Sequence, residues 1–557
     1  MPHRSRSAVG LLWGLALIPW TAAAQPPVTR ADYERAQGLR DRYQYLTISV
    51  PDGATWLGKG TRFLYRRSAA GGHEFVIADA ATLEKKPAFD HARLAATLAH
   101  LTGGKHTAVR LPFNTVTFSP DESVIRFQVG QDRWRCTLAT YECRKEDPPP
   151  VRPGSLRGVS GPVRDAEAQR EARPRPSPDG KWEAVVQNYN LAVRPAGGGK
   201  SVPLSTDGSE GNFYELASAV WSPDSRRLAA YRVRPGYRRY IHYVESSPED
   251  QVQPRHWTLL YAKPGDVLDL EQPVLFTATS AAEGTLTWRQ QDIPNDLFPN
   301  PYELSPLVWR KDSHALSFEY NQRGHQVYRV IEVDAASGRQ RVVISEEPKT
   351  FFYYNEASSN RSAGKKFRYD VADGREVVWM SERDGWNHLY LYDGATGAVK
   401  NRITTGEWAV RGIEKVDEEK RQIWFSANGM DAGRDPYFLH YFRIDFDGTG
   451  LTRLTTTDAD HEVRFSADMQ YYVDTYSRVD LPTVSELHRA SDGSLVRELE
   501  RGDIAALVAA GWKPPEVFVA KGRDDRTDIW GIIVRPTNLD PKRKYPVIES
   551  IYAGPHG

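Results

Sequence analysis

The sequence predicts an all-β fold, a β-propeller built from about eight four-stranded blades. Three observations favour it: a recurring turn of Ser-Pro-Asp type, a second recurring turn that ends in Gly, and a composition suited to strands. Of the 557 residues, 40% are hydrophobic, and 15 Trp and 27 Tyr are of the kind enriched in half-buried strands. A chain of this length and composition can bury a large core.

The Ser-Pro-Asp turn joins two expected strands at three places in the first half of the chain. It begins at Ser119, Ser177 and Ser222. Pro presets φ for the second turn position, and Asp can hydrogen-bond the backbone two residues on. Strands are expected to follow it over 124–129, 182–187 and 228–233, and after weaker copies over 315–320 and 471–476.

A second hairpin tends to follow each of these turns. It ends in Asp, small residues and Gly, as after Asp334, Asp393 and Asp447. Four strands recurring about every 50–60 residues are typical of a propeller, and roughly 485 residues then correspond to about eight blades. A pair of β-sandwiches is the alternative, but it would not reuse the same turn at the same place in each unit.

Two segments interrupt this pattern, and a cysteine pair lies between them. Leu94, Leu98 and Leu101 have helical spacing, which predicts a short amphipathic helix over 90–101. Residues 147–175 contain three consecutive Pro and many charges, as expected of a surface linker. A tight hairpin would set Cys136 opposite Cys143, which favours a disulfide in an exported chain, with two free thiols as the alternative.

The N-terminus has the pattern of a secretory signal peptide over residues 1–24. A basic start precedes an apolar run over 8–20, and small residues follow it before Gln25. No stretch reaches the roughly 18 apolar residues of a membrane span. We therefore expect export to the periplasm or the medium without an integral span, and an uncleaved N-terminal anchor is the alternative.

The last part of the chain has strands of a different kind. Two apolar strands are expected over 516–520 and 528–535, joined by a charged turn, and a third over 546–551. They resemble the start of an α/β-hydrolase sheet, but no Gly-x-Ser-x-Gly, the elbow that carries a nucleophilic serine, occurs in the sequence. We expect residues 25–510 to form the propeller and residues 511–557 to form the beginning of an incomplete hydrolase domain, without a Ser-His-Asp triad.

Four segments of the sequence have a family likeness: 87–94, 381–390, 404–408 and 552–555. Through them the chain resembles the dipeptidyl peptidase IV family of prolyl oligopeptidase-type serine peptidases, whose members place a propeller before an α/β-hydrolase domain. The resemblance implies a secreted serine exopeptidase that releases N-terminal dipeptides after Pro or Ala from peptides with a free N-terminus. It also implies a possible homodimer at full length.

The resemblance assigns roles to two residues. Tyr552 is the expected hydroxyl donor to the oxyanion, and Glu215 is the expected ligand of the substrate ammonium. The family pattern commonly pairs two glutamates there, whereas Leu216 follows Glu215, so this sequence offers a single carboxylate at that place. The alternative for Tyr552 is a structural tyrosine in a core or an interface, and the alternative for Glu215 is a solvated acid.

Other chemistry finds little support in the sequence. A formal net charge of +1 favours neither nucleic acid nor an anionic membrane as a partner. His461 and Glu462 lack the second His of a helical zinc motif, so we expect neither a metal ion nor a cofactor. The alternative to a peptidase is a non-catalytic secreted propeller that binds peptides or other proteins, and we expect the chain as given to lack turnover.

Overall fold

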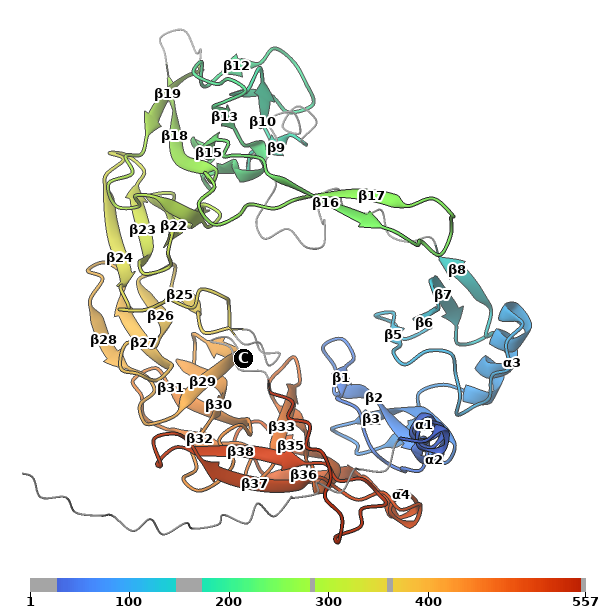
Figure 1. Cartoon of the computed structure of the whole chain (residues 1–557). Helices are drawn as coiled ribbons and strands as arrows, with labels where there is room; N and C mark the ends of the chain where they lie inside the picture. Colours follow the sequence, from blue (N-terminus) through green and yellow to red (C-terminus); the bar gives the residue numbers. More distant parts are fainter. Residues whose placement is uncertain (1–27, 147–172, 281–285, 358–363, 552–557) are drawn as a thin grey trace, which may run out of the picture.

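The computed structural model describes residues 28–146, 173–280, 286–357 and 364–551. The expected signal peptide and most of the expected linker lie outside these residues. The prediction of an all-β fold is confirmed. Figure 1 shows antiparallel sheets that follow one another in chain order around an arc, an arrangement that fits a propeller.

Six sheets of four strands and two of five strands make up the arc in the described part of the chain, and we number them first to eighth in chain order. The first four sheets contain β1 Thr55–Trp56, β2 Arg62–Ala69, β3 Gly72–Asp79 and β4 Lys85–Pro87; β5 Thr117–Phe118, β6 Val124–Val129, β7 Asp132–Thr137 and β8 Cys143–Glu146; β9 Arg175–Pro176, β10 Trp182–Gln187, β11 Asn190–Pro195 and β12 Val202–Pro203; and β13 Phe213–Tyr214, β14 Val220–Trp221, β15 Arg227–Arg234, β18 Leu270–Ser280 and β19 Leu286–Asp292.

The fifth to eighth sheets repeat this plan. They contain β20 Pro301–Leu304, β21 Val308–Trp309, β22 Ala315–Gln322, β23 Tyr328–Asp334 and β24 Gln340–Glu346; β25 Arg368–Val371, β26 Glu376–Ser381, β27 His388–Asp393 and β28 Val399–Arg402; β29 Ala409–Asp417, β30 Gln422–Asn428, β31 His440–Asp445 and β32 Thr452–Arg453; and β33 Asp460–Phe465, β34 Tyr471–Arg478, β35 Leu481–Arg489 and β36 Leu495–Arg501.

The Ser-Pro-Asp turns adopt one hydrogen-bonding pattern in successive sheets. The Oγ atoms of Ser119, Ser177 and Ser222 donate to the Asp two residues on, at 2.5, 2.7 and 2.6 Å. Each Oγ also accepts the backbone N–H five residues on, at 3.0, 3.0 and 2.9 Å. The turn thus satisfies the first N–H of the following strand, as its residue types predict.

Tryptophan side chains join neighbouring sheets. Trp221 of β14 donates its indole N–H to the carbonyl of Arg175 in β9 at 2.9 Å, and Trp309 of β21 donates to Val220 in β14 at 3.1 Å. Trp56 of β1 makes the equivalent bond to Arg464 of β33 at 2.8 Å. Because the last bond links the first and eighth sheets, the first and last sheets of the chain lie side by side there.

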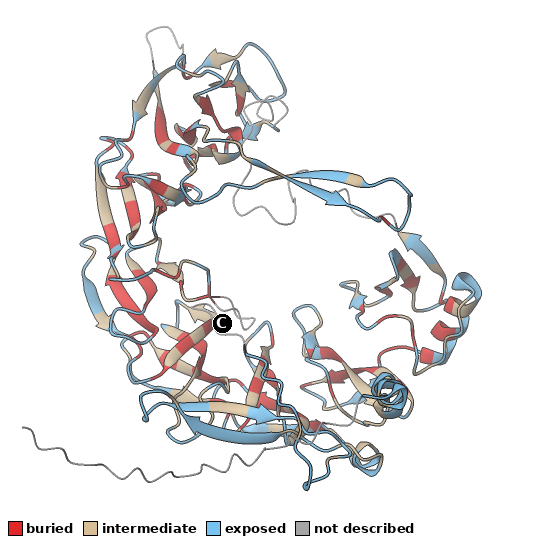
Figure 2. Ribbon diagram, in the orientation of Figure 1, coloured by how far each residue is buried: buried red, intermediate tan, exposed pale blue. Residues whose placement is uncertain are grey.

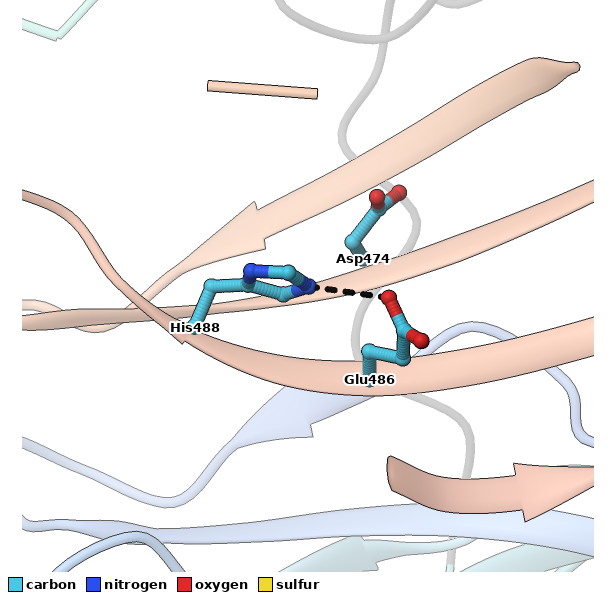
Figure 3. A group of neighbouring side chains, drawn as sticks. All are labelled: Asp474, Glu486 and His488. Carbon is cyan, nitrogen blue, oxygen red and sulfur yellow. Dashed lines mark hydrogen bonds and ion pairs between the residues drawn. The ribbon is translucent and has the colours of Figure 1, made fainter. Parts of the chain in front are cut away.

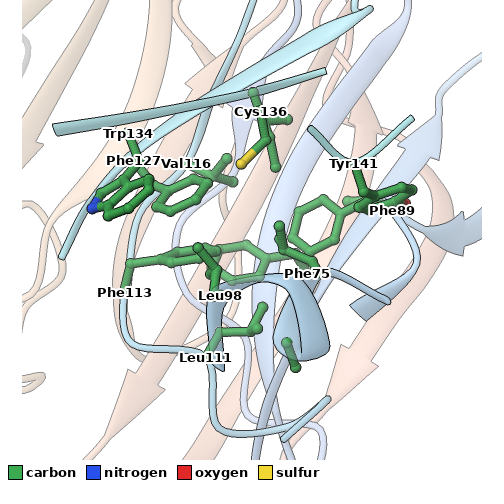
Figure 4. Packing of buried hydrophobic residues seen from close by; sticks show 14 of the residues in the cluster. Phe75, Phe89, Leu98, Leu111, Phe113, Val116, Phe127, Trp134, Cys136 and Tyr141 are labelled. Carbon is green, nitrogen blue, oxygen red and sulfur yellow. The ribbon is translucent and has the colours of Figure 1, made fainter. Parts of the chain in front are cut away.

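The predicted amphipathic helix is α3, His91–Thr102, which packs against the first two sheets. Asp90 caps its N-terminus by accepting from the N–H of Arg93 at 3.0 Å. Leu94 and Leu98 are fully buried in a cluster with side chains from β3, β6 and β7 (Figure 4). Leu101, expected on the same buried face, is instead exposed because it falls in the last turn, beyond the cluster.

Cys136 of β7 and Cys143 of β8 lie directly opposite each other and form a disulfide, with their Cα atoms 4.1 Å apart. Closing so short a loop is worth about 2–3 kcal/mol in the chain-entropy account. We expect urea titration to give a free energy of unfolding lower by that amount for the Cys136→Ser/Cys143→Ser protein. Mass spectrometry of unreduced parent protein should recover the two peptides linked, and free alkylatable thiols in material from an oxidising compartment would contradict this.

One hairpin and two short helices lie outside the eight sheets in this part of the chain. Strands β16, Tyr240–Glu245, and β17, Arg255–Leu260, project away from the fourth sheet, and their residues are largely exposed (Figure 2). Helices α1, Arg30–Gln37, and α2, Leu39–Tyr43, bury no residue. None of the helices among the described residues is long and apolar enough to cross a bilayer.

The C-terminal region after the eighth sheet contains α4, Ala505–Ala509, and a hairpin of β37, Glu516–Lys521, with β38, Asp528–Ile533. Val517 and Ile529 of this hairpin are about half exposed. The strand expected over 546–551 is wrong: those residues are exposed and pair with no strand. An extended segment without a hydrogen-bonded neighbour does not form a sheet.

Candidate functional site

Glu215, the residue expected to bind an ammonium group, lies at the end of β13 and immediately before the short helix η2, Leu216–Ser218. It is buried, with 8% of its surface exposed. Its N–H donates to the carbonyl of Tyr231 in β15 at 3.0 Å, and its carbonyl accepts the Ser218 hydroxyl at 2.7 Å. These bonds fix the backbone of Glu215 on the fourth sheet.

A second set of contacts ties η2 to the third sheet. The Arg175 guanidinium of β9 donates to the carbonyl of Leu216 at 3.3 Å and to that of Ala217 at 2.9 Å. Tyr214 and Leu216 are buried with side chains of β10 and β11. Glu215 therefore sits at the junction of two sheets, where both hold its neighbours in place.

A polar network adjoins this junction. Tyr214 donates its hydroxyl to Asp207 at 2.8 Å, and Arg232 pairs with Asp207 and, at 2.8 Å, with Asp292. Burial, followed by the bond to Asp207, raises the pKa of the Tyr214 hydroxyl. Burial opposes ionisation of Asp207, but Tyr214 and Arg232 together lower its pKa. The network is thus ionised at Asp207 and neutral at Tyr214.

Tyr552, the expected oxyanion donor, lies outside the described residues, so the structure sets no distance between it and Glu215. The described part of the chain therefore brings no catalytic pair together around Glu215.

A group of metal-ligand side chains that sequence reasoning missed lies in the eighth sheet. Asp474 of β34 and Glu486 and His488 of β35 have one ligand atom each within 4.8 Å of one another (Figure 3). His488 Nε2 is 3.1 Å from Glu486 Oε2. Burial lowers the pKa of His488, but its bonds to Glu486 and to the Gly493 carbonyl outweigh this and raise it. The bond from His488 in turn lowers the pKa of Glu486.

The signal for this group is strand periodicity, not a motif. Glu486 and His488 are two residues apart and so share one face of a strand. Asp474 joins them because the hairpin register sets it opposite Glu486. The expectation of no metal ion rested on the cysteine count and on the missing second His of a helical motif, and neither pattern covers ligands on neighbouring strands.

Comparison with known proteins matches residues 116–483 to the family described as the dipeptidyl peptidase IV (DPP IV) N-terminal region. The chain is 26% identical over 347 residues to a probable dipeptidyl peptidase 4 of Arthroderma benhamiae, covering 60% of this chain and 42% of the relative. It is 23% identical over 400 residues to a probable dipeptidyl peptidase 4 of Emericella nidulans, covering 68% of this chain and 50% of the relative. The chain thus spans half or less of these relatives.

Two solved structures are similar to this chain. A Bacteroides ovatus protein described as a dipeptidyl aminopeptidase IV superimposes with a TM-score of 0.50 at 16% identity, covering 89% of this chain and 66% of that one. The dipeptidyl peptidase 4 of Porphyromonas gingivalis gives a TM-score of 0.48 at 20% identity, covering 94% and 69%. Since the matched family region includes 116–483, about two thirds of the sequence, this chain belongs to the dipeptidyl peptidase IV family and carries its N-terminal region.

Proposed function

We propose that this chain supplies the peptide-recognition region of a secreted serine exopeptidase that releases N-terminal dipeptides, with a preference for Pro or Ala. The family match over residues 116–483 carries the proposal. Under this proposal, the eight sheets are the blades of a propeller over residues 25–510, and residues 511–557 begin the α/β-hydrolase domain. A peptide with a free N-terminus is the substrate class, and a homodimer is the expected full-length assembly.

Glu215 is the residue proposed to hold the substrate ammonium. Hydrogen bonds of its N–H and carbonyl fix the Glu215 backbone at the junction of two sheets, so its carboxylate starts from a fixed position, and burial strengthens its pairing with a positive charge. Tyr552 is proposed to donate its hydroxyl to the oxyanion, since a phenol can stabilise charge that develops within about 3 Å. Catalysis itself requires a nucleophile elbow, and the printed residues contain none.

A peptide-binding experiment tests the role of Glu215. We expect Glu215→Gln to weaken binding of a Gly-Pro or Ala-Pro peptide by about 2 kcal/mol or more, because the ammonium loses a charged partner. Isothermal titration with the free and the N-acetylated peptide provides the measurement, and the acetylated peptide should bind parent and variant equally weakly.

Glu210→Gln is the matched control, because Glu210 is an exposed acid five residues away. It should leave the affinity unchanged. Equal affinity of the parent chain for free and acetylated peptides would contradict the role given to Glu215.

A non-catalytic propeller that binds peptides is the second candidate, favoured by the absence of Gly-x-Ser-x-Gly from these residues. The two candidates differ in turnover. A gene product that includes an elbow serine and cleaves a Gly-Pro chromogenic substrate supports the first, whereas binding without turnover in that product supports the second.

A further inference from the structure

Asp474, Glu486 and His488 offer two carboxylates and one imidazole to a common point on the eighth sheet. Their ligand atoms lie within 4.8 Å of one another, and His488 Nε2 is 3.1 Å from Glu486 Oε2. Two ligands bound at about 2.0–2.2 Å in a tetrahedron are about 3.3 Å apart. The His488–Glu486 separation already suits a shared ion, and Asp474 would join it by turning its carboxylate from His461, whose Nδ1 lies 2.9 Å from both its oxygens.

Outer contacts orient each of these side chains. His488 Nδ1 is 2.9 Å from the Gly493 carbonyl, which can only accept, so Nδ1 carries a proton and Nε2 faces Glu486. His461 Nδ1 lies 2.9 Å from both oxygens of Asp474. In metal sites, a ligating His commonly donates its other ring N–H to a carbonyl, and a ligating carboxylate commonly accepts a hydrogen bond. Both kinds of contact are present here.

The surroundings combine burial with a route from solvent. Asp474 is 2% and His488 9% exposed, and the Tyr472 ring stacks on His488 with centroids 5.0 Å apart. The Glu486 side chain is less enclosed, with 15% of its surface exposed. A cation can therefore reach the group past Glu486 and then lie in a largely dry environment.

The charge of this group has to be balanced. Two carboxylates in register on neighbouring buried strands repel each other at low dielectric. Arg501 of β36 forms its ion pair with Glu498 at 2.5 Å and acts on Glu486 only from a distance. His461 lies with Nδ1 2.9 Å from both oxygens of Asp474 and with Nε2 2.8 Å from the Thr457 carbonyl, so it can donate from both nitrogens. A bound cation therefore competes with protons on the histidines for this place.

We propose that Asp474, Glu486 and His488 bind one divalent cation of the Zn²⁺ class, with water completing the coordination. Mixed imidazole and carboxylate ligands suit Zn²⁺, which takes both at similar distances. Binding at His488 Nε2 releases to solvent the proton otherwise shared with Glu486. The ion would join β34 to β35 in the sheet that meets the first sheet, which is a structural role independent of the proposed peptidase function.

Metal analysis of the full chain tests this site. The exposed pair His242 and His256 on the β16–β17 hairpin, with ring nitrogens 3.1 Å apart, could also take Zn²⁺, so all proteins carry His242→Gln. After stripping with EDTA and dialysis against Zn²⁺, we expect one ion per chain by mass spectrometry. We also expect a melting temperature higher by about 2 °C or more than that of the stripped protein.

His488→Gln and Glu486→Gln should each lower Zn²⁺ affinity by about 10-fold or more. His388→Gln is the matched control, because His388 is a fully buried His of the sixth sheet that contacts Thr404 and the Gly406 carbonyl. It should retain the ion.

Three results would overturn the proposal: no stoichiometric Zn²⁺ in the His242→Gln chain, undiminished affinity in both ligand variants, or equal loss in His388→Gln. The first would mean that protonated histidines balance the carboxylates. Far-UV circular dichroism in EDTA establishes that each variant is folded, and if His488→Gln is not, the partly exposed Glu486 provides the decisive variant.

Discussion

Replacing Glu500 with alanine is expected to lower the free energy of unfolding by about 3–5 kcal/mol, the cost of breaking a buried ion pair. Glu500 of β36 binds Arg67 of β2 at 2.8 Å and Lys85 of β4 at 2.5 Å, and accepts the Tyr65 hydroxyl at 2.8 Å. Its side chain is 4% exposed. The substitution leaves two cations without their shared partner at the contact between the first and eighth sheets.

Urea unfolding followed by tryptophan fluorescence provides the measurement. Glu498→Ala is the control, because Glu498 lies on the same strand and pairs with Arg501 at an exposed position. An exposed pair is worth about 0–1 kcal/mol. If the two variants lose equal stability, Glu500 does not hold the first and eighth sheets together.

The contribution of Glu500 should depend on pH in a defined direction. Burial raises the pKa of this carboxyl, but bonds from Lys85, Tyr65 and Arg67 outweigh it, so the folded pKa lies below the usual value of 4.5. A lowered folded pKa gives stability that is present above the unfolded pKa and lost as the pH falls through the folded one. The difference between parent and Glu500→Gln should therefore be full near neutrality and shrink below about pH 4.5.

Trp379→Ala is expected to lower the free energy of unfolding by about 3–5 kcal/mol, because buried area is lost and a cavity remains. Trp379 of β26 is fully buried between the fifth and sixth sheets. Its ring stacks near Phe352, with centroids 6.3 Å apart and planes 8° apart. Its indole N–H donates to Glu346 of β24 at 2.8 Å, so one side chain provides both packing and a polar link between sheets.

Trp379→Phe separates these two contributions. Phenylalanine keeps part of the ring contact but loses the hydrogen bond, and Glu346 retains Arg383 at 2.5 Å as a partner. We expect Trp379→Phe to lower the free energy of unfolding by about 1–2 kcal/mol. Trp386→Ala, at a 41% exposed position in the same sheet's hairpin, should stay within about 0.5 kcal/mol in the same urea titration. A Trp379→Ala protein as stable as Trp386→Ala would contradict the packing described.

The repeated hairpins could be predicted from the residues because local chemistry specifies them. The turn at Ser222 needs a hydroxyl, a Pro and an Asp within three positions, and the hydrogen bonds of the Ser222 hydroxyl lie within six residues. The same holds for α3, whose Asp90 cap and leucine spacing are visible in the sequence. Strand existence follows likewise from period-two alternation over short stretches.

Contacts between distant segments required the tertiary structure. Arg67 and Glu500 meet across 433 residues, and no local pattern pairs them among the many charges of the chain. Glu215 could be singled out by resemblance, but its burial at the junction of two sheets is set by Arg175 and Tyr231. Asp474 and Glu486 face each other in a register that one irregularity, between Tyr476 and Arg478, shifts relative to the hairpin turn. Hydrophobic pattern and turn type therefore determined the hairpins of this protein. The contact between the first and eighth sheets arose only from long-range packing, and the carboxylate–histidine group from the register of one hairpin.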